Sequence, residues 1–454
     1  SSSSGIPDGQ NWCAAVEYGL IRHFSLPRWP GIAAPQPAPL VKSPTTRGRV
    51  MAGRRTRPAS RLGDKKAQAR SQNTVICQPV PHRLPSGNHP LQFVIALRAI
   101  AATIIVWHHF AIYPPLREWA APLMGDVLDW LAQHARTTQV FFVVGGYVMA
   151  RSMSARCWNL RRIRSFVVQR YCRLGVPYLG AIAMILPIYV VARDWLPGQV
   201  VGEPPTLPQL LAHLFFLQGI LGYEQLSAGL WFVCINFQLG LVYAASLWLR
   251  DTVGQGKVDF VGLLGWPLLA FSLFHFNLDE AWDSWWLYFF PYFFMGVVIH
   301  RSVRGEARRL EFWLCALLFV GAMTFEWRWR LVSALVVGVV LFAVERRGLG
   351  GRWPQVSLLS WLGRISFSLF LVHFPVLVLV GALWARFDWV SAEAGVAGLL
   401  TAFGLSLLVA ELFYRLVERP AARLHRRMPQ PEAEGGTPRP AAREALPSPV
   451  LNTR

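Results

Sequence analysis

The chain has 454 residues, of which 53% are hydrophobic and only 15% are charged, and it contains 20 Trp and 28 Phe. Because a soluble protein carries about a quarter charged residues, this composition excludes an ordinary soluble protein and indicates a membrane protein. The formal net charge is +20, but the sequence contains no recognisable nucleic-acid-binding module. Basic cytoplasmic segments of a membrane protein explain the same charge, so we expect no nucleic acid as partner. The six cysteines show no metal-ligand spacing, and we predict no metal site.

The first part of the chain, residues 1 to about 90, is rich in Pro, Ser, Gly and Arg and shows no sustained apolar periodicity. We therefore expect a disordered basic N-terminal tail, without a cleaved secretory signal, and with Met51 as an alternative start of translation. The predicted organisation is a tail over 1–90, a membrane domain over 91–420 and a disordered C-terminal tail over 421–454. The bias toward Arg, Ala and Trp is typical of a GC-rich bacterium, so we expect a multi-pass protein of the inner membrane.

Ten apolar segments follow the tail, and each approaches the roughly 20 residues that a helix needs to cross a bilayer. They lie near residues 93–113, 138–152, 174–192, 228–248, 260–276, 283–300, 312–327, 331–344, 364–384 and 394–416. An eleventh candidate, 207–222, is less clear.

The charges of the loops decide the topology. With ten spans, the basic loops 151–173, 301–311 and 345–363 share one side with both termini, and the first carries seven Arg and no acid. The positive-inside rule makes this side cytoplasmic. If 207–222 also crossed, the two later loops would face outward. We therefore predict an all-α integral membrane protein with about ten transmembrane helices, both termini cytoplasmic, and 207–222 re-entrant or interfacial.

The first span contains Arg98, His108 and His109, although hydrocarbon penalises such groups strongly. On a helix, residues 98 and 109 share one face, roughly 16 Å apart along the axis, whereas residue 108 points about 80° away. One face therefore presents a guanidinium toward the cytoplasm and an imidazole toward the outer half, and both should face the bundle interior. The alternative is that Arg98 extends to the interface and the histidines bind water at the outer surface.

Five motifs occur along the chain: LRAIAATIIVWHH (97–109), VFFVVGGYVM (140–149), QRYCRLGVPY (169–178), LGRISFSLFLVHFPV (362–376) and LFYRLVERP (412–420). In order and spacing they resemble the acyltransferase-3 family of integral membrane O-acyltransferases. The family pattern places ten residues between Arg and His, which selects His109 over His108. Gly145 stands where the family usually has Ser.

One motif departs from the family. Where many members read W-S-L-S-x-E-E-Q-F-Y, this chain reads WFVCINFQLGLVY (231–243). Trp231 and Gln238 match, but Asn236 and Phe237 replace common acids. If an acid orients the catalytic His in relatives, that role is filled differently here, or Asn236 supplies only a hydrogen bond.

The resemblance implies transfer of an acyl group, most often acetyl, from cytoplasmic acyl-CoA to an extracytoplasmic hydroxyl. Histidine suits proton abstraction near neutral pH, so His109 is the expected general base or a transient acyl carrier. His373 is a second catalytic candidate. Arg98, which is also a catalytic candidate, joins Arg170 and Arg173 as an expected ligand of the donor phosphates.

Trp231 and Asn236 are expected to orient the acceptor, which would be a glycan, a lipid or a small molecule in contact with membrane lipid. Arg161, Arg162 and Arg164 are better explained by topology alone. Glu411 and Glu418 flank Arg415 at spacings suited to helical ion pairs. Two alternative functions stay open: a proton-coupled transporter or flippase, because transport also uses intramembrane Arg and His, and a catalytically silent protein that binds lipid or glycan.

Overall fold

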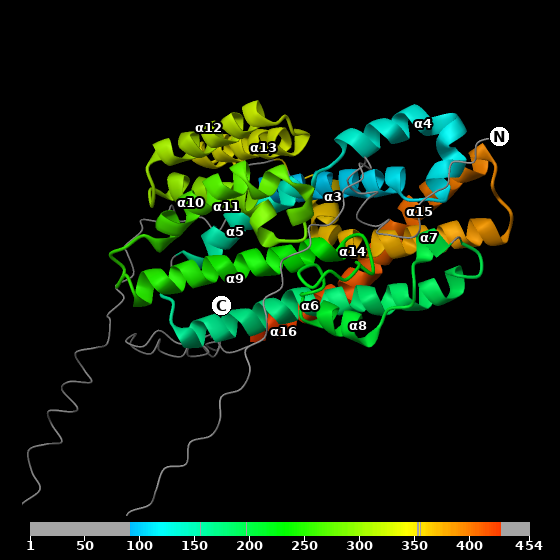
Figure 1. Ribbon diagram of the computed structural model, residues 1–454, viewed down its shortest axis with the longest axis horizontal. Coiled ribbons are helices and arrows are strands. Elements are labelled where there is room, and N and C mark those ends of the chain that lie inside the picture. The colour runs from blue at the N-terminus through cyan, green and yellow to red at the C-terminus, as the bar shows by residue number, and fades with distance from the viewer. Residues whose placement is uncertain (1–90, 155, 197, 352–353, 355, 428–454) are drawn as a thin grey trace, which may run out of the picture. The chain divides into compact units, whose positions relative to one another are not determined.

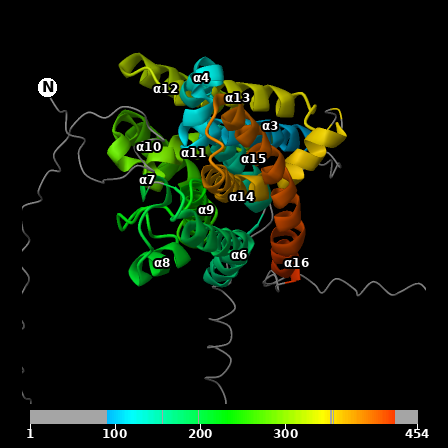
Figure 2. The same cartoon turned by 90° about the vertical axis from the view of Figure 1, so that its right-hand side faces the viewer.

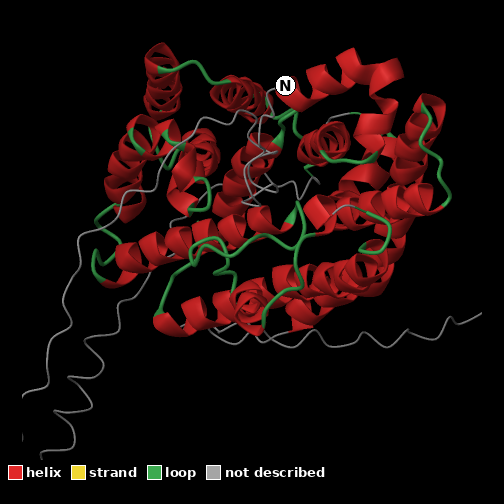
Figure 3. Ribbon diagram, turned by 45° about the vertical axis from the view of Figure 1, so that its right-hand side comes forward, coloured by secondary structure: helices red, strands yellow, loops and turns green. Residues whose placement is uncertain are grey.

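The computed structural model describes residues 91–154, 156–196, 198–351, 354 and 356–427. Every regular element in these ranges is a helix, and they contain no strand (Figures 1 and 3). The first elements are α3 (Gln92–Ile112), α4 (Leu116–His134), α5 (Thr138–Met153), α6 (Leu160–Ala192), α7 (Gly198–Val201), α8 (Leu207–Leu214), α9 (Leu230–Thr252) and α10 (Phe260–Phe274). They are followed by η1 (Phe276–Leu278), η2 (Glu280–Trp282), α11 (Trp286–Arg304), α12 (Arg309–Phe325), α13 (Trp329–Arg346), α14 (Ser357–Arg386), α15 (Ala392–Phe413), η3 (Tyr414–Glu418) and α16 (Arg419–Arg427).

Each of the ten predicted apolar segments coincides with a helix, but several bounds differ, and α14 begins at Ser357, well before the predicted start at 364. Helix α6 begins at Leu160, well before the predicted start at 174, because Asn159 caps it by accepting a 2.9 Å bond from the Arg162 amide. The arginine-rich part of the predicted loop is therefore helical. At the other end of the chain, α16 continues to Arg427, past the predicted domain end at 420. The predicted tail over 1–90 and the rest of the C-terminal tail lie outside the described residues.

Helix α4 is a further helix that lies outside the ten predicted apolar segments. It is amphipathic: Leu116, Ala120 and Leu128 are buried, whereas Arg117 and Asp129 form a 2.5 Å ion pair on its exposed side. Its buried side packs against α3 and α15.

Six helical stretches are long and apolar enough to cross a membrane, judged by length and composition. They are Gln92–Ile112, Leu160–Ala192, Leu230–Thr252, Phe260–Leu278, Ser357–Arg386 and Ala392–Leu424. The described part of the chain is therefore all-helical and has membrane-spanning capacity. The four other predicted spans correspond to α5, α11, α12 and α13.

The segment 207–222 contains only the eight-residue helix α8. Its rise of about 12 Å is well short of the roughly 30 Å of a bilayer core. His213 links α8 to α6 by a hydrogen bond with Tyr178. Burial lowers the pKa of His213 to about 4, so the ring is neutral at pH 7. Its Nε2 must donate to the Glu224 carbonyl at 3.2 Å, and its Nδ1 accepts from the Tyr178 hydroxyl at 2.7 Å.

The buried side chains form two hydrophobic cores that meet at α3. One core is built mainly from α5, α9 and α10 to α13, and the other mainly from α4, α6, α9, α14 and α15. Helix α3 contributes Ala101 and Ile105 to the first core and Ala102 and Val106 to the second. Polar groups on α3 are therefore enclosed by packed helices on both sides.

The closest helix crossing is between α5 and α11. A Cβ added at Gly146 would lie 1.9 Å from the Phe293 carbonyl oxygen, and one added at Gly296 would lie 2.0 Å from the Val143 carbonyl oxygen. Small residues allow this kind of backbone approach in membrane helices, where packing rather than the hydrophobic effect drives association. Glycine is therefore required at both positions.

We predict that Gly146→Ala and Gly296→Ala each lower the stability of the protein by about 2 kcal/mol or more, because the added methyl group would overlap backbone atoms. Thermal melting in detergent measures this. Gly404→Ala in α15 is the control, because nothing lies within 4 Å of a Cβ built there. Wild-type melting of both crossing variants would contradict the prediction.

Candidate active site

Helix α14 organises the site. It is the most buried of the six membrane-capable helices, and it packs against α3, α6 and α15 (Figure 2). A Cβ added at Gly363 would touch Ile95 of α3, and one at Gly381 would touch Pro115 just beyond it. Contacts thus advance in the same direction along both helices, so α3 and α14 run parallel.

A histidine pair lies at the contact of these helices. His109 Nδ1 on α3 is 2.6 Å from His373 Nε2 on α14, and the two side chains are 2% and 0% exposed. The rings are nearly coplanar, with 7° between their planes. Two nitrogens at this distance share one proton, so one of them donates and the other accepts.

The second nitrogen of His373 decides which one donates. His373 Nδ1 lies 3.1 Å from the Leu369 carbonyl oxygen, and a carbonyl only accepts, so His373 Nδ1 carries a hydrogen. We infer that His373 Nε2 accepts from His109 Nδ1–H. This tautomer leaves the lone pair of His109 on Nε2, which is the form that a general base requires.

His108 is turned away from this pair. It is buried, with 2% exposure, and its Nδ1 lies 3.2 Å from the Leu131 carbonyl oxygen of α4. The prediction that His108 binds water at the outer surface is therefore wrong, because α4 covers it. The geometry agrees with the choice of His109 over His108.

Arg98 lies on α3 nearer its N-terminal end and bonds to α14. Its Nη2 donates to Ser366 Oγ at 3.0 Å, and Ser366 Oγ donates to the Gly363 carbonyl at 2.9 Å. The prediction that Arg98 and His109 both face the bundle interior is confirmed, and both reach partners on α14. Sequence reasoning missed Ser366, although it precedes His373 by seven residues, about two helical turns, and so shares its face.

Arg173 and Glu418 extend this charged end. The Glu418 carboxylate accepts from Ser368 Oγ at 2.5 Å and interacts electrostatically with Arg98 and Arg173. The predicted ion pair of Arg415 with Glu411 is confirmed at 2.6 Å. Glu418 instead turns toward α14, because the π-helical turn η3 changes the spacing of side chains around the helix.

Arg170 on α6 reaches α9, where its Nη2 donates to the Asn236 carbonyl at 2.7 Å and to Asn236 Oδ1 at 3.1 Å. Gly240 makes room for it, since a Cβ there would lie 2.5 Å from Arg170 Nε. Among the described residues, Arg170 Nε has no hydrogen-bond partner. Asn236 therefore orients Arg170.

Two of the three departures from the family motifs are neighbours: a Cβ on Gly145 would lie 3.8 Å from Asn236 Oδ1. Trp231, the other expected acceptor residue, lies five residues earlier on α9, and its ring is tilted against that of Phe289 with 5.1 Å between ring centroids. A chain of aromatic contacts then leads through Phe232 and Phe370 to His373. The residues predicted for acceptor binding and for catalysis are thus connected by packed rings.

A family model described as an acyltransferase domain matches residues 91–415. Glucans biosynthesis protein C from Salmonella schwarzengrund (strain CVM19633) is 23% identical over 363 residues, covering 68% of this chain and 85% of that protein. The proteins of the same name from Salmonella paratyphi B (strain ATCC BAA-1250 / SPB7) and Salmonella agona (strain SL483) match to the same extent. No solved structure matches. Because the family model covers most of the chain, this protein belongs to the acyltransferase-3 family.

Proposed function

We propose that the protein is a membrane O-acyltransferase that moves an acyl group, most simply acetyl, from cytoplasmic acyl-CoA to a hydroxyl of an extracytoplasmic acceptor. The observation that carries this proposal is the buried pair of His109 and His373, whose hydrogen bonds leave a basic lone pair on His109 Nε2. A membrane acyltransferase needs a base of this kind, held away from bulk water.

In the proposed reaction His109 Nε2 removes the acceptor hydroxyl proton while the oxygen attacks the acyl carbon. The ester bond forms, the carbon–sulfur bond breaks, and the proton passes from His109 to the coenzyme A thiolate. His373 acts as a positioning residue, because its Nε2 accepts from His109 Nδ1–H and so holds the productive tautomer. In the alternative sequence His109 first takes the acyl group, releases coenzyme A and then passes the group to the acceptor.

The donor would be held at the guanidinium end of the site. Coenzyme A carries several phosphate charges, and arginine forks bind phosphate well. Arg98, Arg170 and Arg173 lie close enough for Arg98 and Arg170 each to sense the charge of Arg173, and Glu418 supplies a nearby negative charge. This residual positive charge supports a site for an anionic donor. Arg98 lies roughly 16 Å from His109 along α3 and bonds to Ser366, so its proposed role is to bind the donor and not to contact the reacting carbonyl.

The parallel contact of α3 and α14 is compatible with the proposed topology of ten spans, and the proposal that both termini are cytoplasmic rests on the basic loops. Two spans that run in the same direction are separated by an odd number of spans. Seven predicted spans, α5, α6 and α9 to α13, lie between them. The arginine cluster would then face the cytoplasm of a bacterial inner membrane, where acyl-CoA is available.

The acceptor is proposed to be a glycan of the cell envelope. The similar proteins are named for glucan biosynthesis, which supports a polysaccharide hydroxyl over a lipid or a small molecule. Trp231 would contact or orient it, whereas Asn236 bonds to Arg170 at the donor end, so we propose no role for Asn236 with the acceptor. This assignment makes the protein a polysaccharide-modifying O-acetyltransferase.

The test is transfer of label from acetyl-CoA to extracted envelope glycan by membranes that contain the protein. We expect an alkali-labile ester with wild type, and at least a ~100-fold loss in His109→Ala and His373→Leu, the usual size of general-base effects. His134→Ala is the matched control, because His134 is an exposed histidine of α4. Transport of glycan into vesicles without acyl-CoA, with no ester formed, would instead establish a transporter, and binding alone a silent protein.

A second prediction concerns the buried charge of Arg170, whose partner here is the uncharged side chain of Asn236. Asn236→Asp should raise the melting temperature, because a carboxylate would turn a hydrogen bond with one charged partner into an ion pair that offsets the buried charge of the guanidinium. Gln238→Glu on the same helix is the control and should lower the melting temperature, because Gln238 Nε2 donates to the Phe216 carbonyl and a glutamate loses that donor. Equal effects of the two acids would contradict this electrostatic account of Arg170.

A further inference from the structure

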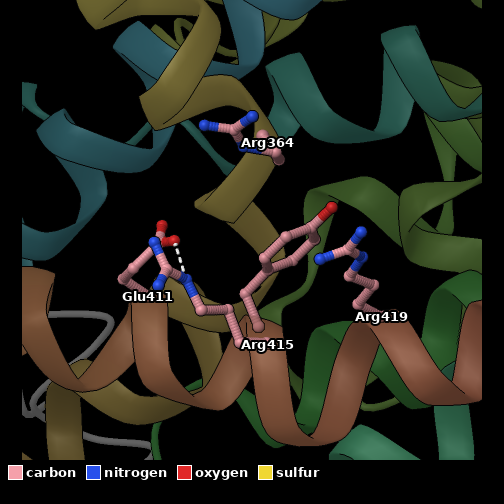
Figure 4. Close-up of a pocket in the computed structure, with 5 residues that line it drawn as sticks. Arg364, Glu411, Arg415 and Arg419 are labelled. Atoms are coloured by element: carbon pink, nitrogen blue, oxygen red, sulfur yellow. Dashed lines mark hydrogen bonds and ion pairs between the residues drawn. The ribbon is translucent and has the colours of Figure 1, made fainter.

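A cavity of about 340 Å³ lies where α14 begins and α15 ends. It is lined by Arg364, Glu411, Tyr414, Arg415 and Arg419. Figure 4 shows Arg364 on α14 across the cavity from Arg415 and Arg419. None of the three arginines was assigned to catalysis or to donor binding above.

The π-helical turn η3 builds this cavity. The Arg419 amide donates to the Tyr414 carbonyl, five residues earlier. In a regular α-helix side chains five residues apart point about 140° away from each other, whereas one π turn places them on the same side. Tyr414 and Arg419 therefore both line the cavity, while Glu418 turns to Ser368.

The turn thereby removes an acid from the cavity. The lining has three guanidinium groups and one carboxylate, a net charge of +2. That carboxylate, Glu411, already accepts from Arg415 Nε at 2.6 Å and from Trp361 Nε1 at 2.8 Å. The bond from Arg415 uses Nε, so its two terminal nitrogens lie outside this ion pair. The electrostatic field of the cavity favours an anion.

A phosphate monoester fits this charge and these groups. It carries about −1.5 to −2 charges at pH 7 and three acceptor oxygens, which match arginine forks. A tyrosine ring beside arginines also provides a stacking surface for a nucleobase. The expected ligand is therefore a phosphate monoester, and an attached aromatic base would add contact with Tyr414.

We propose that this cavity binds the 3′-phosphate at the adenosine end of acyl-CoA, an inference that rests on the proposed acyl-CoA donor. The distance is within reach. Arg364 and His373 are nine residues apart on α14, a rise of roughly 13.5 Å. The arm of coenzyme A between its diphosphate and its sulfur has the backbone length of about four extended residues, or roughly 14 Å, and the ribose and the diphosphate add further length between the 3′-phosphate and the sulfur.

The test compares coenzyme A with dephospho-coenzyme A, which lacks only the 3′-phosphate, for binding to the full-length protein in nanodiscs of zwitterionic lipid. Wild type should bind coenzyme A at least about tenfold more tightly, the effect expected for a charge-assisted hydrogen bond. Arg364→Gln and Arg419→Gln should each abolish this preference and leave binding of dephospho-coenzyme A unchanged. Arg386→Gln, exposed at the opposite end of α14, should behave as wild type.

Equal binding of the two compounds to wild type, or equal weakening of both in the cavity variants, would overturn the proposal. Nanodiscs containing phosphatidate, which has a monoester headgroup, distinguish the other source of phosphate. If the cavity variants lose phosphatidate binding but keep the preference for coenzyme A, the site belongs to a lipid and the donor assignment is wrong. If neither coenzyme A compound binds wild type, both this assignment and the donor of the proposed function fail. Intact donor binding without a phosphate preference refutes the cavity assignment alone.

Discussion

The structure depends on one constraint: a polar side chain inside an apolar helix bundle must find its partner within the protein, because lipid offers none. Helix α14 supplies these partners through Ser366, Ser368 and His373. Arg98 and His109 of α3 each bond to a residue of α14, so two polar contacts at different depths fix the same register. A slip of either helix by one residue would break both contacts. The groups that are most costly in lipid thus also align the two helices that carry them.

Close backbone packing makes these polar contacts geometrically feasible. Gly363 lets the α14 backbone approach Ile95 of α3, one turn before Ser366 meets Arg98. In α9, Gly240 likewise leaves room for a close approach, because the Arg170 guanidinium lies against the helix backbone there. Glycine therefore allows close packing in two situations, between two helix backbones and between a helix backbone and a charged side chain. Because α3 is packed on both sides by separate hydrophobic cores, the site lies at the seam between two helix groups, where a modest shift of one group would change its access.

Much of this arrangement could be predicted from sequence, because helical periodicity and hydropathy are local properties. The common face of Arg98 and His109 and the ten apolar segments are of this kind. The misses have physical causes. Hydropathy indicates which segments can lie in lipid and does not indicate helicity. Amphipathic α4 and the arginine-rich start of α6 are helical but not apolar throughout, so hydropathy did not identify them. The π turn over Tyr414–Glu418 has no comparable sequence signal, so the direction of Glu418 was unpredictable. The bond between His109 and His373 joins residues 264 positions apart, and only tertiary packing brings them together.

The choice of histidine to orient histidine follows from the surroundings. In water-exposed enzymes a carboxylate often holds the catalytic imidazole, but a carboxylate beside His109 would place a permanent charge deep among apolar helices. His373 fulfils the same geometric role without a charge: its Nδ1–H is taken by the Leu369 carbonyl, so its Nε2 can only accept. The site is then electrically neutral in its resting state and acquires charge only while a proton is transferred. The absence of the common acids at Asn236 and Phe237 does not weaken this arrangement, because Asn236 contacts Arg170 at the charged end. The charged arginines thus lie where the donor would enter. The uncharged histidine pair, which would supply the general base, lies where α3 and α14 are most deeply buried.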